Sequence, residues 1–535
     1  MLRLDYVSPL PPTRTGIADY SADLLPHLAS RCDLRLIALP GQAVSQELRA
    51  RWRPAAVDEL GRGSAAVGAP GGEPRLPLYM MGNNVHHLPV WRAAMATAGV
   101  LVLHDLVLHH FQLERTLARG DAAGYASQLA ADHGWVGQRV AAAASRGVLG
   151  NTAQFALPLR HSLLVRQRGV LVHSLWGVDE LREEDPRLRV ARVPMPVPLP
   201  APADLAAGLE LRRRLGIPDG APVLASVGFQ TPMKRTALAV RALAEPALAQ
   251  AHLLVAGEVS PYSGIESLAR ELGVERRVHM MGYVPFAELE RVIAAADLCL
   301  NLRFPTAGET SASLLRILAL GRPAVVSDHA QFRELPDEAV LKVPVGEQSA
   351  GELAARVAAV VAAPERLRAL GEAGRRYVAR AHDPAAAAAA LVEACLEWQS
   401  AAPPGLPAAA ERPPSSLVWG DLPGELAVEG VEAWSPGERR RIRFRLRNRG
   451  VARWLPAAHG QGGVALRLEL HGPGVDTSRP LEWLPLPHEL PPGGEHVFET
   501  TLRRPLGPVR LRALPRLVGM DDLAQFGGPW WEGDV

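Results

Sequence analysis

The chain has 535 residues, which is too long for one hydrophobic core, so we expect about two to four domains. Its 58 basic and 56 acidic residues leave a formal net charge of +2, which is too even for nucleic-acid binding through bulk charge. The three cysteines are isolated, and neither an apolar run of about 18 residues nor a signal peptide is recognisable. We therefore expect a cytoplasmic protein, with peripheral attachment to the inner face of the membrane left open.

The first 200 residues alternate between short apolar runs and helical patterns. Residues 2–9 resemble a strand, and 16–29 follow as an amphipathic helix. Such alternation predicts a parallel sheet with helices on both faces, and hence a first doubly wound domain over residues 1–200. The other strands expected here are 33–39, 75–82, 99–105 and 169–176.

A second series follows the Pro-rich stretch 193–204 and predicts a second doubly wound domain over residues 201–400. Its last helix, 384–398, is rich in alanine and is expected to pack back on the first domain. The strands expected are 221–229, 251–258, 277–284, 296–302 and 323–328, with helices over 264–273 and 286–296 between them.

The composition changes after residue 400. Residues 401–416 are rich in Pro and Ala and predict a linker. Apolar residues then alternate with period two, as in 441–450 and 464–472, which predicts a β-sandwich over residues 417–535. The expected fold class is therefore α/β, with two tandem Rossmann-like domains and a C-terminal all-β sandwich.

Residues 303–323 lead a polar turn into an apolar helix. Ligands of open parallel sheets bind beyond the carboxyl ends of the strands, where helix N-termini attract phosphate. Gly308, Thr310 and Ser311 have the character of a phosphate site, whereas the Glu309 carboxylate suits sugar hydroxyls. A simple helix cap made by Thr or Ser is an equal alternative.

Residues 226–236 place two cations after the first strand of the second series. The strand ends at Gly228, and Lys234 and Arg235 follow. The chain has only two lysines, so a lysine at this edge indicates a role in holding a diphosphate. The alternative is a solvated helix start.

Residues 101–112 carry a run of histidines after a strand. His104 is placed to contact a substrate, and Asp105 to orient it or to line an acceptor cleft. His109 and His110 are expected either in packing or in that cleft. Metal binding is disfavoured because the spacing lacks a third ligand. Gly16, in the loop after the first strand, could touch a sugar, but no dinucleotide-binding glycine pattern is present.

Taken in order, the stretches "PPTRTGIADYS", "VLHDLVLHH", "GFQTPMKR" and "FPTAGETSASLLRILALGRPAVVSD" resemble the group 1 family of retaining glycosyltransferases with the GT-B fold, over residues 1–400. The resemblance implies a nucleotide-diphosphate sugar as donor, bound mainly by the second domain, and a glycan or lipid-linked acceptor bound mainly by the first. It also implies that no metal or other cofactor is needed. Cell-surface polysaccharide assembly is the role that it suggests.

The resemblance carries over unevenly. Lys234 matches the diphosphate-binding lysine of the family, while Phe229 replaces its usual arginine partner and Arg235 is expected to compensate. The family has two glutamates at the helix start. Here the first aligns with Gly308, next to Glu309, and the second with Arg316, so Arg316 and Glu334 are candidate nucleotide contacts.

The resemblance implies transfer with retained anomeric configuration, with His104, Lys234 and Glu309 at the reaction centre. Lys234, Arg235 and backbone N–H groups would stabilise the leaving diphosphate, which would also accept the proton of the acceptor. His104 would contact the donor sugar near its anomeric carbon. Two other functions stay open: a non-catalytic glycan-binding or assembly protein, and a nucleotide-sugar epimerase or hydrolase. The latter needs a pair of carboxylates in the cleft, which the sequence does not reveal.

The C-terminal region resembles the immunoglobulin-like modules of bacterial enzymes, through "RNRGVARWLP", "LPPGGEHVFE" and "FGGPWW". Alternating arginines on one strand are expected either on a solvated outer face or in a patch for anionic glycans or lipid headgroups, which leaves a peripheral contact through this module open. Trp530 and Trp531 are expected to be buried, with sugar stacking as the alternative. The arginines are Arg441, Arg443, Arg445 and Arg447.

Overall fold

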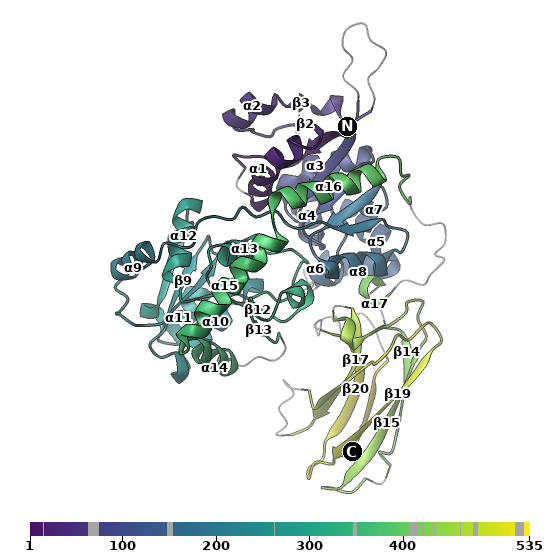
Figure 1. Cartoon of the computed structure of the whole chain (residues 1–535). Helices are drawn as coiled ribbons and strands as arrows, with labels where there is room; N and C mark the ends of the chain where they lie inside the picture. Colours follow the sequence, from purple (N-terminus) through teal and green to yellow (C-terminus); the bar gives the residue numbers. More distant parts are fainter. Residues whose placement is uncertain are drawn as a thin grey trace.

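The structure is a computed structural model of the whole chain, and Figure 1 shows two α/β lobes and a β module below them. The parts of the chain that it describes are 1–13, 15–62, 74–146, 153–261, 263–345, 350–405, 415–419, 422–432, 434–460, 462–473, 480–518 and 529–534. Most of the expected linker 401–416 lies outside these residues.

The first lobe is built on a seven-stranded parallel sheet of order β3-β2-β1-β4-β5-β6-β7. Its apolar strands are buried on both faces, as in a doubly wound fold. The five strands expected from the sequence are present, and the short β3 and β7 are additional. The strands are β1 (Arg3–Val7), β2 (Asp33–Ala38), β3 (Ala55–Ala56), β4 (Leu76–Met81), β5 (Val100–Leu103), β6 (Gly169–Val172) and β7 (Val190–Arg192).

The helices of the first lobe include the predicted one over residues 16–29. Thr15 caps it, because its side chain accepts a hydrogen bond from the N–H of Ala18 at 3.1 Å. The helices are α1 (Gly16–Ala29), α2 (Gln46–Trp52), α3 (Leu88–Ala96), α4 (His109–Arg115), α5 (Ala122–Ala144), α6 (Ala153–Ala156), α7 (His161–Leu164) and α8 (Leu175–Glu184).

The second lobe is built on a six-stranded parallel sheet of order β10-β9-β8-β11-β12-β13. The order reverses between β8 and β11, and a ligand crevice forms at such a switch point. The strands are β8 (Val223–Val227), β9 (His252–Ala256), β10 (Val278–Gly282), β11 (Leu298–Asn301), β12 (Ala324–Ser327) and β13 (Leu341–Val343). The helices are α9 (Leu205–Arg214), α10 (Thr236–Leu243), α11 (Ile265–Glu271), α12 (Phe286–Ala295), α13 (Ala312–Ala319), α14 (Ala350–Val361), α15 (Pro364–Ala381) and α16 (Pro384–Trp398).

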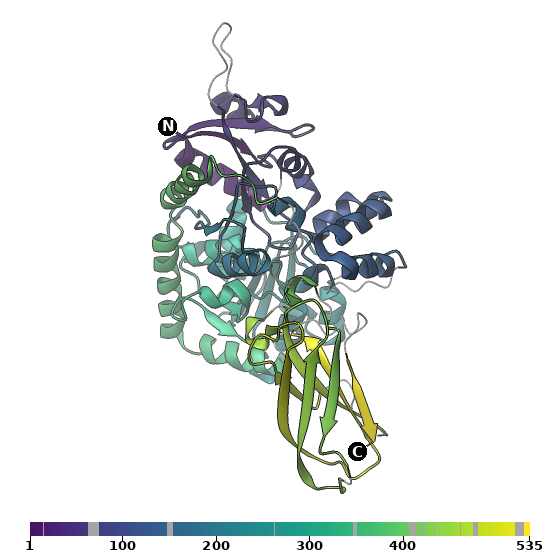
Figure 2. The ribbon, with the colours of Figure 1, turned by 90° about the vertical axis from the view of Figure 1, so that its right-hand side faces the viewer.

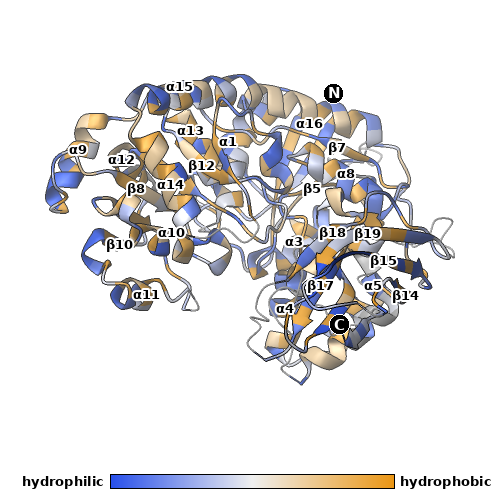
Figure 3. Cartoon of the chain, turned by 90° about the horizontal axis from the view of Figure 1, so that it is seen from below, coloured by the Kyte–Doolittle hydropathy of each residue, from blue (hydrophilic) through white to orange (hydrophobic). Residues whose placement is uncertain are grey.

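The last of these helices returns to the first lobe. Figure 3 shows α15 and α16 following one another along the same edge of the molecule. α16 packs against α1, and the buried ring of Trp398 lies over Gly169, where any Cβ would overlap it. The end of the second lobe is therefore anchored on the first.

The C-terminal module is all-β, as predicted. A three-stranded sheet of order β14-β15-β19 faces a second sheet built on β16-β17-β20-β21, with β18 beside β17. Its core contains the fully buried Trp454 and Phe444. The elements are α17 (Ser416–Trp419), β14 (Gly424–Glu429), β15 (Arg439–Asn448), β16 (Leu455–Pro456), β17 (Gly463–His471), β18 (Glu482–Pro485), β19 (Glu495–Arg503), β20 (Arg510–Leu517) and β21 (Trp531–Asp534).

The arginines of β15 do not form a free cationic patch. Arg443 pairs with Glu499 at 2.7 Å, and Arg445 pairs with Glu495 at 3.0 Å, both across the strands. Such cross-strand pairs neutralise the outer face, which favours the solvated-face interpretation. Trp531 is partly buried against the core, but Trp530 is 63% exposed and lies beside Arg512, so its expected burial is wrong.

The β module contacts the first lobe through α17, which packs against α5, and through polar residues that face α8. Arg453 forms an ion pair with Glu183, and His459 lies 3.6 Å from Glu180. Burial raises the pKa of Glu180 to about 8. Figure 2 shows the module extending away from both lobes below this contact. None of the helices in the described ranges is long and apolar enough to cross a bilayer.

Candidate functional site

The carboxyl ends of the two parallel sheets meet at one place. The N–H of Val107, after β5, donates to the carbonyl of Ala307, after β11, at 3.0 Å. Gly308 has a φ of +78°, and a Cβ there would lie 2.6 Å from Leu106. A side chain at residue 308 would thus push the lobes apart, which explains why glycine stands where the two loops touch.

Lys234 lies at the switch point of the second sheet. It ends a short 3-10 helix (Pro232–Lys234), and its Nζ donates to the carbonyl of Val227 at the end of β8. A Cβ at Gly228 would lie 2.7 Å from that Nζ, so the glycine makes room for the ammonium group. Only 9% of Lys234 is exposed, and burial lowers its pKa well below the usual range, with a smaller contribution from the charge of Arg303.

Arg303 is the second cation of the site, and sequence reasoning missed it. It follows β11 across the switch point from Lys234, and its side chain is buried. Its Nε donates to Glu309 Oε1 at 3.1 Å. Burial lowers the pKa of Arg303, while the Glu309 charge raises it. The one signal in the sequence was its position directly after a predicted strand.

Glu309 is held in place from three sides. Besides Arg303, its carboxylate accepts from the Thr306 hydroxyl at 3.1 Å and from the Ala307 N–H at 3.0 Å. Gln331 donates to its backbone carbonyl at 2.7 Å. The Glu309 carboxylate therefore lies beside two buried basic side chains, Arg303 and Lys234, and an anionic ligand would favour the charged form of both.

The other residues predicted around the diphosphate have different partners. Arg235 lies with its guanidinium 5.9 Å from the ring centre of Phe304 and donates weakly to the Val345 carbonyl. Ser311 caps α13 by accepting from the Leu314 N–H at 3.3 Å, which is the capping role left open above. Thr310 lines a cavity beside the site. Gly16 begins α1, with open space around the position of a Cβ.

His104 and Asp105 are residues of the first lobe that lie at the site. His104 is buried edge-on against Tyr20, with ring centres 4.5 Å apart, and burial keeps its pKa well below the usual range, so the imidazole is neutral. Asp105 accepts from the N–H of Asn83 at 2.8 Å, and the structure gives it no bond to His104. Burial, followed by the charge of Glu309, raises the pKa of Asp105 to about 7. Two carboxyl groups from different lobes thus share the site.

The raised pKa of Asp105 predicts that the free energy of unfolding depends on pH. Because its pKa is raised in the folded protein, the unfolded chain ionises first as the pH rises from about 4 to 7. Stability therefore falls over this range by roughly 4 kcal/mol, the equivalent of about three pKa units, and Asp105→Asn should abolish that fall. Urea unfolding at a series of pH values measures it. An equal dependence of stability on pH in the variant and in the wild type would contradict this prediction.

His109 and His110, at the start of α4, have different surroundings. His109 is buried, and its two ring nitrogens contact the Leu157 carbonyl and the Tyr125 hydroxyl, each at 2.6 Å. His110 is exposed and lies 3.5 Å from Glu114 on the same helix. These contacts fit the packing interpretation for His109, and a role of either histidine in an acceptor cleft stays a prediction. The partners of His109 could not be named from the sequence, because they come from α5 and from residues before α7.

Glu334 and Arg316 make contacts between the lobes instead of pointing toward Lys234. Glu334 accepts from the N–H groups of Leu175 at 3.0 Å and Trp176 at 2.5 Å, so it caps α8 of the first lobe. Arg316 extends from α13 toward α1, 3.8 Å from Asp19 and 4.0 Å from Asp23. Both positions differ from a nucleotide contact beside the diphosphate.

Reversing the charge of Arg316 tests this contact. Arg316→Glu would place a third carboxylate opposite Asp19 and Asp23, whose pKa values are already raised by burial. We expect a loss of about 1 kcal/mol at low salt, with Arg316→Met losing less. The difference should vanish in 1 M salt, where the screening length is about 3 Å. Urea unfolding measures it, and equal stability of the Glu and Met variants at low salt would contradict it.

Comparison with known proteins gives a match to part of the chain. Residues 209–377 match the family model described as glycosyl transferases group 1. A D-inositol 3-phosphate glycosyltransferase of Segniliparus rotundus is 33% identical over 176 residues, which are 32% of this chain and 38% of that relative. The match thus spans less than half of either protein.

Several solved structures match about three quarters of the chain. Sucrose-phosphate synthase of Thermosynechococcus elongatus is 17% identical, with a TM-score of 0.48 over 74% of this chain and 99% of that one. Anabaena HepE in complex with UDP-glucose is 12% identical, with a TM-score of 0.48 over 74% of this chain and 100% of that one. A glycosyltransferase of Rickettsia africae is 10% identical, with a TM-score of 0.47 over 75% and 99%.

Proposed function

We propose that this chain is a group 1 glycosyltransferase that moves a sugar from a nucleotide-diphosphate donor to an acceptor with retention of configuration. The match of residues 209–377 to the family supports the activity. The observation that carries the proposal is the pair of buried cations, Lys234 and Arg303, with Glu309 as their shared carboxylate. A diphosphate is the anion that these two basic side chains would bind.

Each residue of the site would have a separate role in such a reaction. Lys234 and Arg303 would bind the diphosphate and stabilise the charge that develops on it as the bond from the anomeric carbon to oxygen breaks. The acceptor hydroxyl would attack from the same face and pass its proton to the leaving oxygen of the diphosphate. Glu309 would accept hydrogen bonds from sugar hydroxyls. Neutral His104 would contact the sugar from the first lobe.

Several finer features belong to the same proposal. No metal is required, because protein cations and the start of α13 supply the positive charge. Arg235, whose guanidinium lies beside Phe304, would compensate for the arginine that Phe229 replaces. The acceptor is a glycan or a lipid-linked sugar used in cell-surface polysaccharide assembly, and the protein works in the cytoplasm at the inner face of the membrane. The β module is immunoglobulin-like and contacts the acceptor or the membrane.

A second function, hydrolysis of the donor, is favoured by the Asp105–Glu309 pair. Asp105 has a pKa of about 7, which suits a general base or acid, and it faces Glu309 across the lobes. In that case water would replace the acceptor hydroxyl. A non-catalytic assembly protein would have no use for two buried cations at a switch point.

Nucleotide binding and product analysis test these functions. Isothermal titration with UDP, GDP and ADP should show binding of one nucleotide, and binding of none would contradict the proposal. Incubation with the matching labelled nucleotide sugar and candidate acceptors then separates transfer from hydrolysis. NMR of the product anomeric proton identifies retention, and an inverted product would refute the retaining mechanism.

A further inference from the structure

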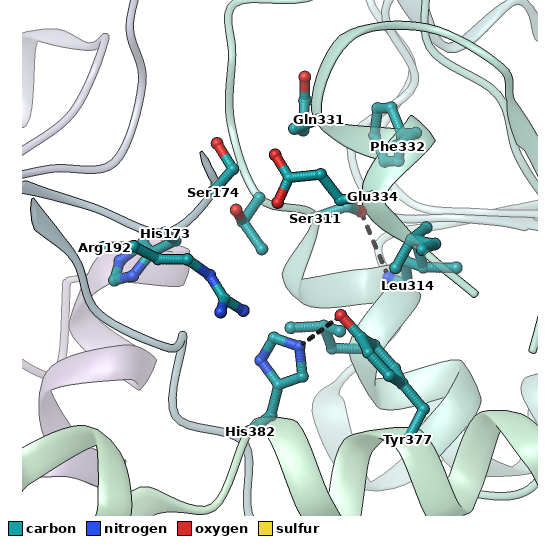
Figure 4. A pocket seen from close by; sticks show the side chains of 13 residues that line it. His173, Ser174, Arg192, Ser311, Leu314, Gln331, Phe332, Glu334, Tyr377 and His382 are labelled. Atoms are coloured by element: carbon teal, nitrogen blue, oxygen red, sulfur yellow. Dashed lines mark hydrogen bonds between the residues drawn. The ribbon is translucent and has the colours of Figure 1, made fainter. Parts of the chain in front are cut away.

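A small cavity lies between the lobes, beside the site of Glu309. It is formed by the ends of β6 and β7 in the first lobe and by the start of α13 and the 3-10 helix Ala330–Glu334 in the second (Figure 4). Its volume is about 40 Å³. One water needs about 10–15 Å³, so the cavity holds a few waters or one small charged group, but no sugar ring. The residues that matter here are Arg192, His173, Ser174, Thr310, Glu334 and His382.

Arg192 is the cation of this cavity. It is the last residue of β7, and Figure 4 shows its guanidinium directed into the space between the lobes. Among the described residues it forms no ion pair and donates no hydrogen bond, and its Nε is buried without a partner. A buried N–H group without an acceptor is unfavourable, and an oxyanion in the cavity would supply that acceptor.

The described neighbours of Arg192 leave its side-chain N–H groups without a hydrogen-bond acceptor. Burial lowers the pKa values of His173 and His382 to about 4, so both are neutral near pH 7. Glu334 is the carboxylate among the described lining residues, and its two oxygens are engaged by the first N–H groups of α8. Ser174 caps α8, so its hydroxyl oxygen is also in use as an acceptor. Buried Nε2 of His173 lacks a hydrogen-bond partner within the described ranges.

We propose that this cavity binds an oxyanion, namely a phosphate monoester carried by the acceptor. Arg192 would hold it through two parallel N–H donors, and the Thr310 hydroxyl would donate from the second lobe. Thr310 directly follows Glu309, so an anion held here would place the rest of an acceptor beside the donor sugar. The identity as an acceptor group rests on the proposed function, whereas the oxyanion site does not.

A bound oxyanion would touch both lobes at once. Arg192 and Ser174 belong to the first lobe, and Thr310 and Gln331 to the second. Its binding would therefore favour the closed arrangement, in which Leu106 lies against Gly308. We expect the melting temperature to rise with anion concentration, because a ligand that binds only the folded state stabilises it.

Titration of the full chain tests the site. Inorganic phosphate, glycerol 1-phosphate and glycerol are titrated by calorimetry at saturating UDP, so that the diphosphate site is filled. Wild type should bind both phosphates and not glycerol. Arg192→Gln should weaken phosphate binding at least tenfold, whereas Arg376→Gln, on the exposed face of α15, should leave it unchanged. Unchanged UDP binding by both variants shows that they are folded.

Three results would overturn the proposal or part of it. Absence of phosphate binding in the wild type, or equal binding by Arg192→Gln, eliminates the oxyanion site. If the wild type binds inorganic phosphate but not glycerol 1-phosphate, the ligand is free phosphate and not a phosphate group carried by an acceptor. If no nucleoside diphosphate binds, the proposed function fails first. The same phosphate titration on Lys234→Met, in which the diphosphate site is disabled, then shows whether the cavity alone binds phosphate.

Discussion

Replacing Lys234 by methionine is expected to lower the rate of sugar transfer by about 10²–10³-fold, the usual effect of removing one charge-stabilising donor. Methionine keeps the length of the side chain in its buried position, so the fold should survive. Removal of an ammonium whose pKa burial already lowers should leave the free energy of unfolding equal or higher. Steady-state transfer with the matching nucleotide sugar measures the rate.

The chain supplies a matched control for Lys234. Its other lysine, Lys342, lies in the same lobe and pairs with Asp337 at 2.7 Å. Lys342→Met should transfer sugar at the wild-type rate. Binding gives a second readout: a diphosphate favours the charged ammonium, so wild-type affinity for the nucleotide should fall as the pH rises, and Lys234→Met should lose this dependence. Normal transfer by Lys234→Met would contradict the proposed site.

Replacing Glu309 by glutamine is expected to change stability and nucleotide binding in opposite directions. Arg303 and Lys234 lose their shared anion, so the free protein should lose about 2 kcal/mol, less than a fully buried pair because Glu309 is partly exposed. The diphosphate then no longer competes with a carboxylate, and the nucleotide should bind about tenfold more tightly, in line with the usual gain from a charge-assisted hydrogen bond. Transfer should fall about 10²-fold, because a contact with the sugar is lost.

Urea unfolding, calorimetry and initial rates measure the three effects of Glu309→Gln separately. Glu271→Gln, an exposed change at the end of α11, should alter none of them. If Glu309→Gln weakened nucleotide binding, Glu309 would hold the nucleotide itself, and its assignment as the counter-ion of Arg303 would be wrong.

The sequence predicts the fold well because strand and helix periods are local. Each expected strand of the two lobes is present, and α1 and α16 begin and end where expected. The strands that were missed, β3, β7 and β13, have two or three residues, too few to show a pattern. Arg192 was overlooked for this reason: it ends β7, and without the strand nothing placed it at the edge of a sheet.

The site was harder to predict because it depends on how the lobes meet. Lys234 and Glu309 could be placed at one edge, since both follow strands of one sheet. Arg303 also follows such a strand, but a single arginine gives no signal in a chain whose basic residues are almost all arginine. The approach of Asp105 to Glu309, and the use of Glu334 as a cap for α8, arise only from the contact between the lobes.

Helix α8 links the contact between the two lobes to the β module. Glu334 of the second lobe holds its first turn, while Glu180 and Glu183 tie its later turns to the β module. Separation of the lobes therefore requires either that Glu334 leaves the first turn of α8 or that α8 moves relative to the β module. A force on the β module would therefore reach, through α8, the contact of Glu334 between the two lobes.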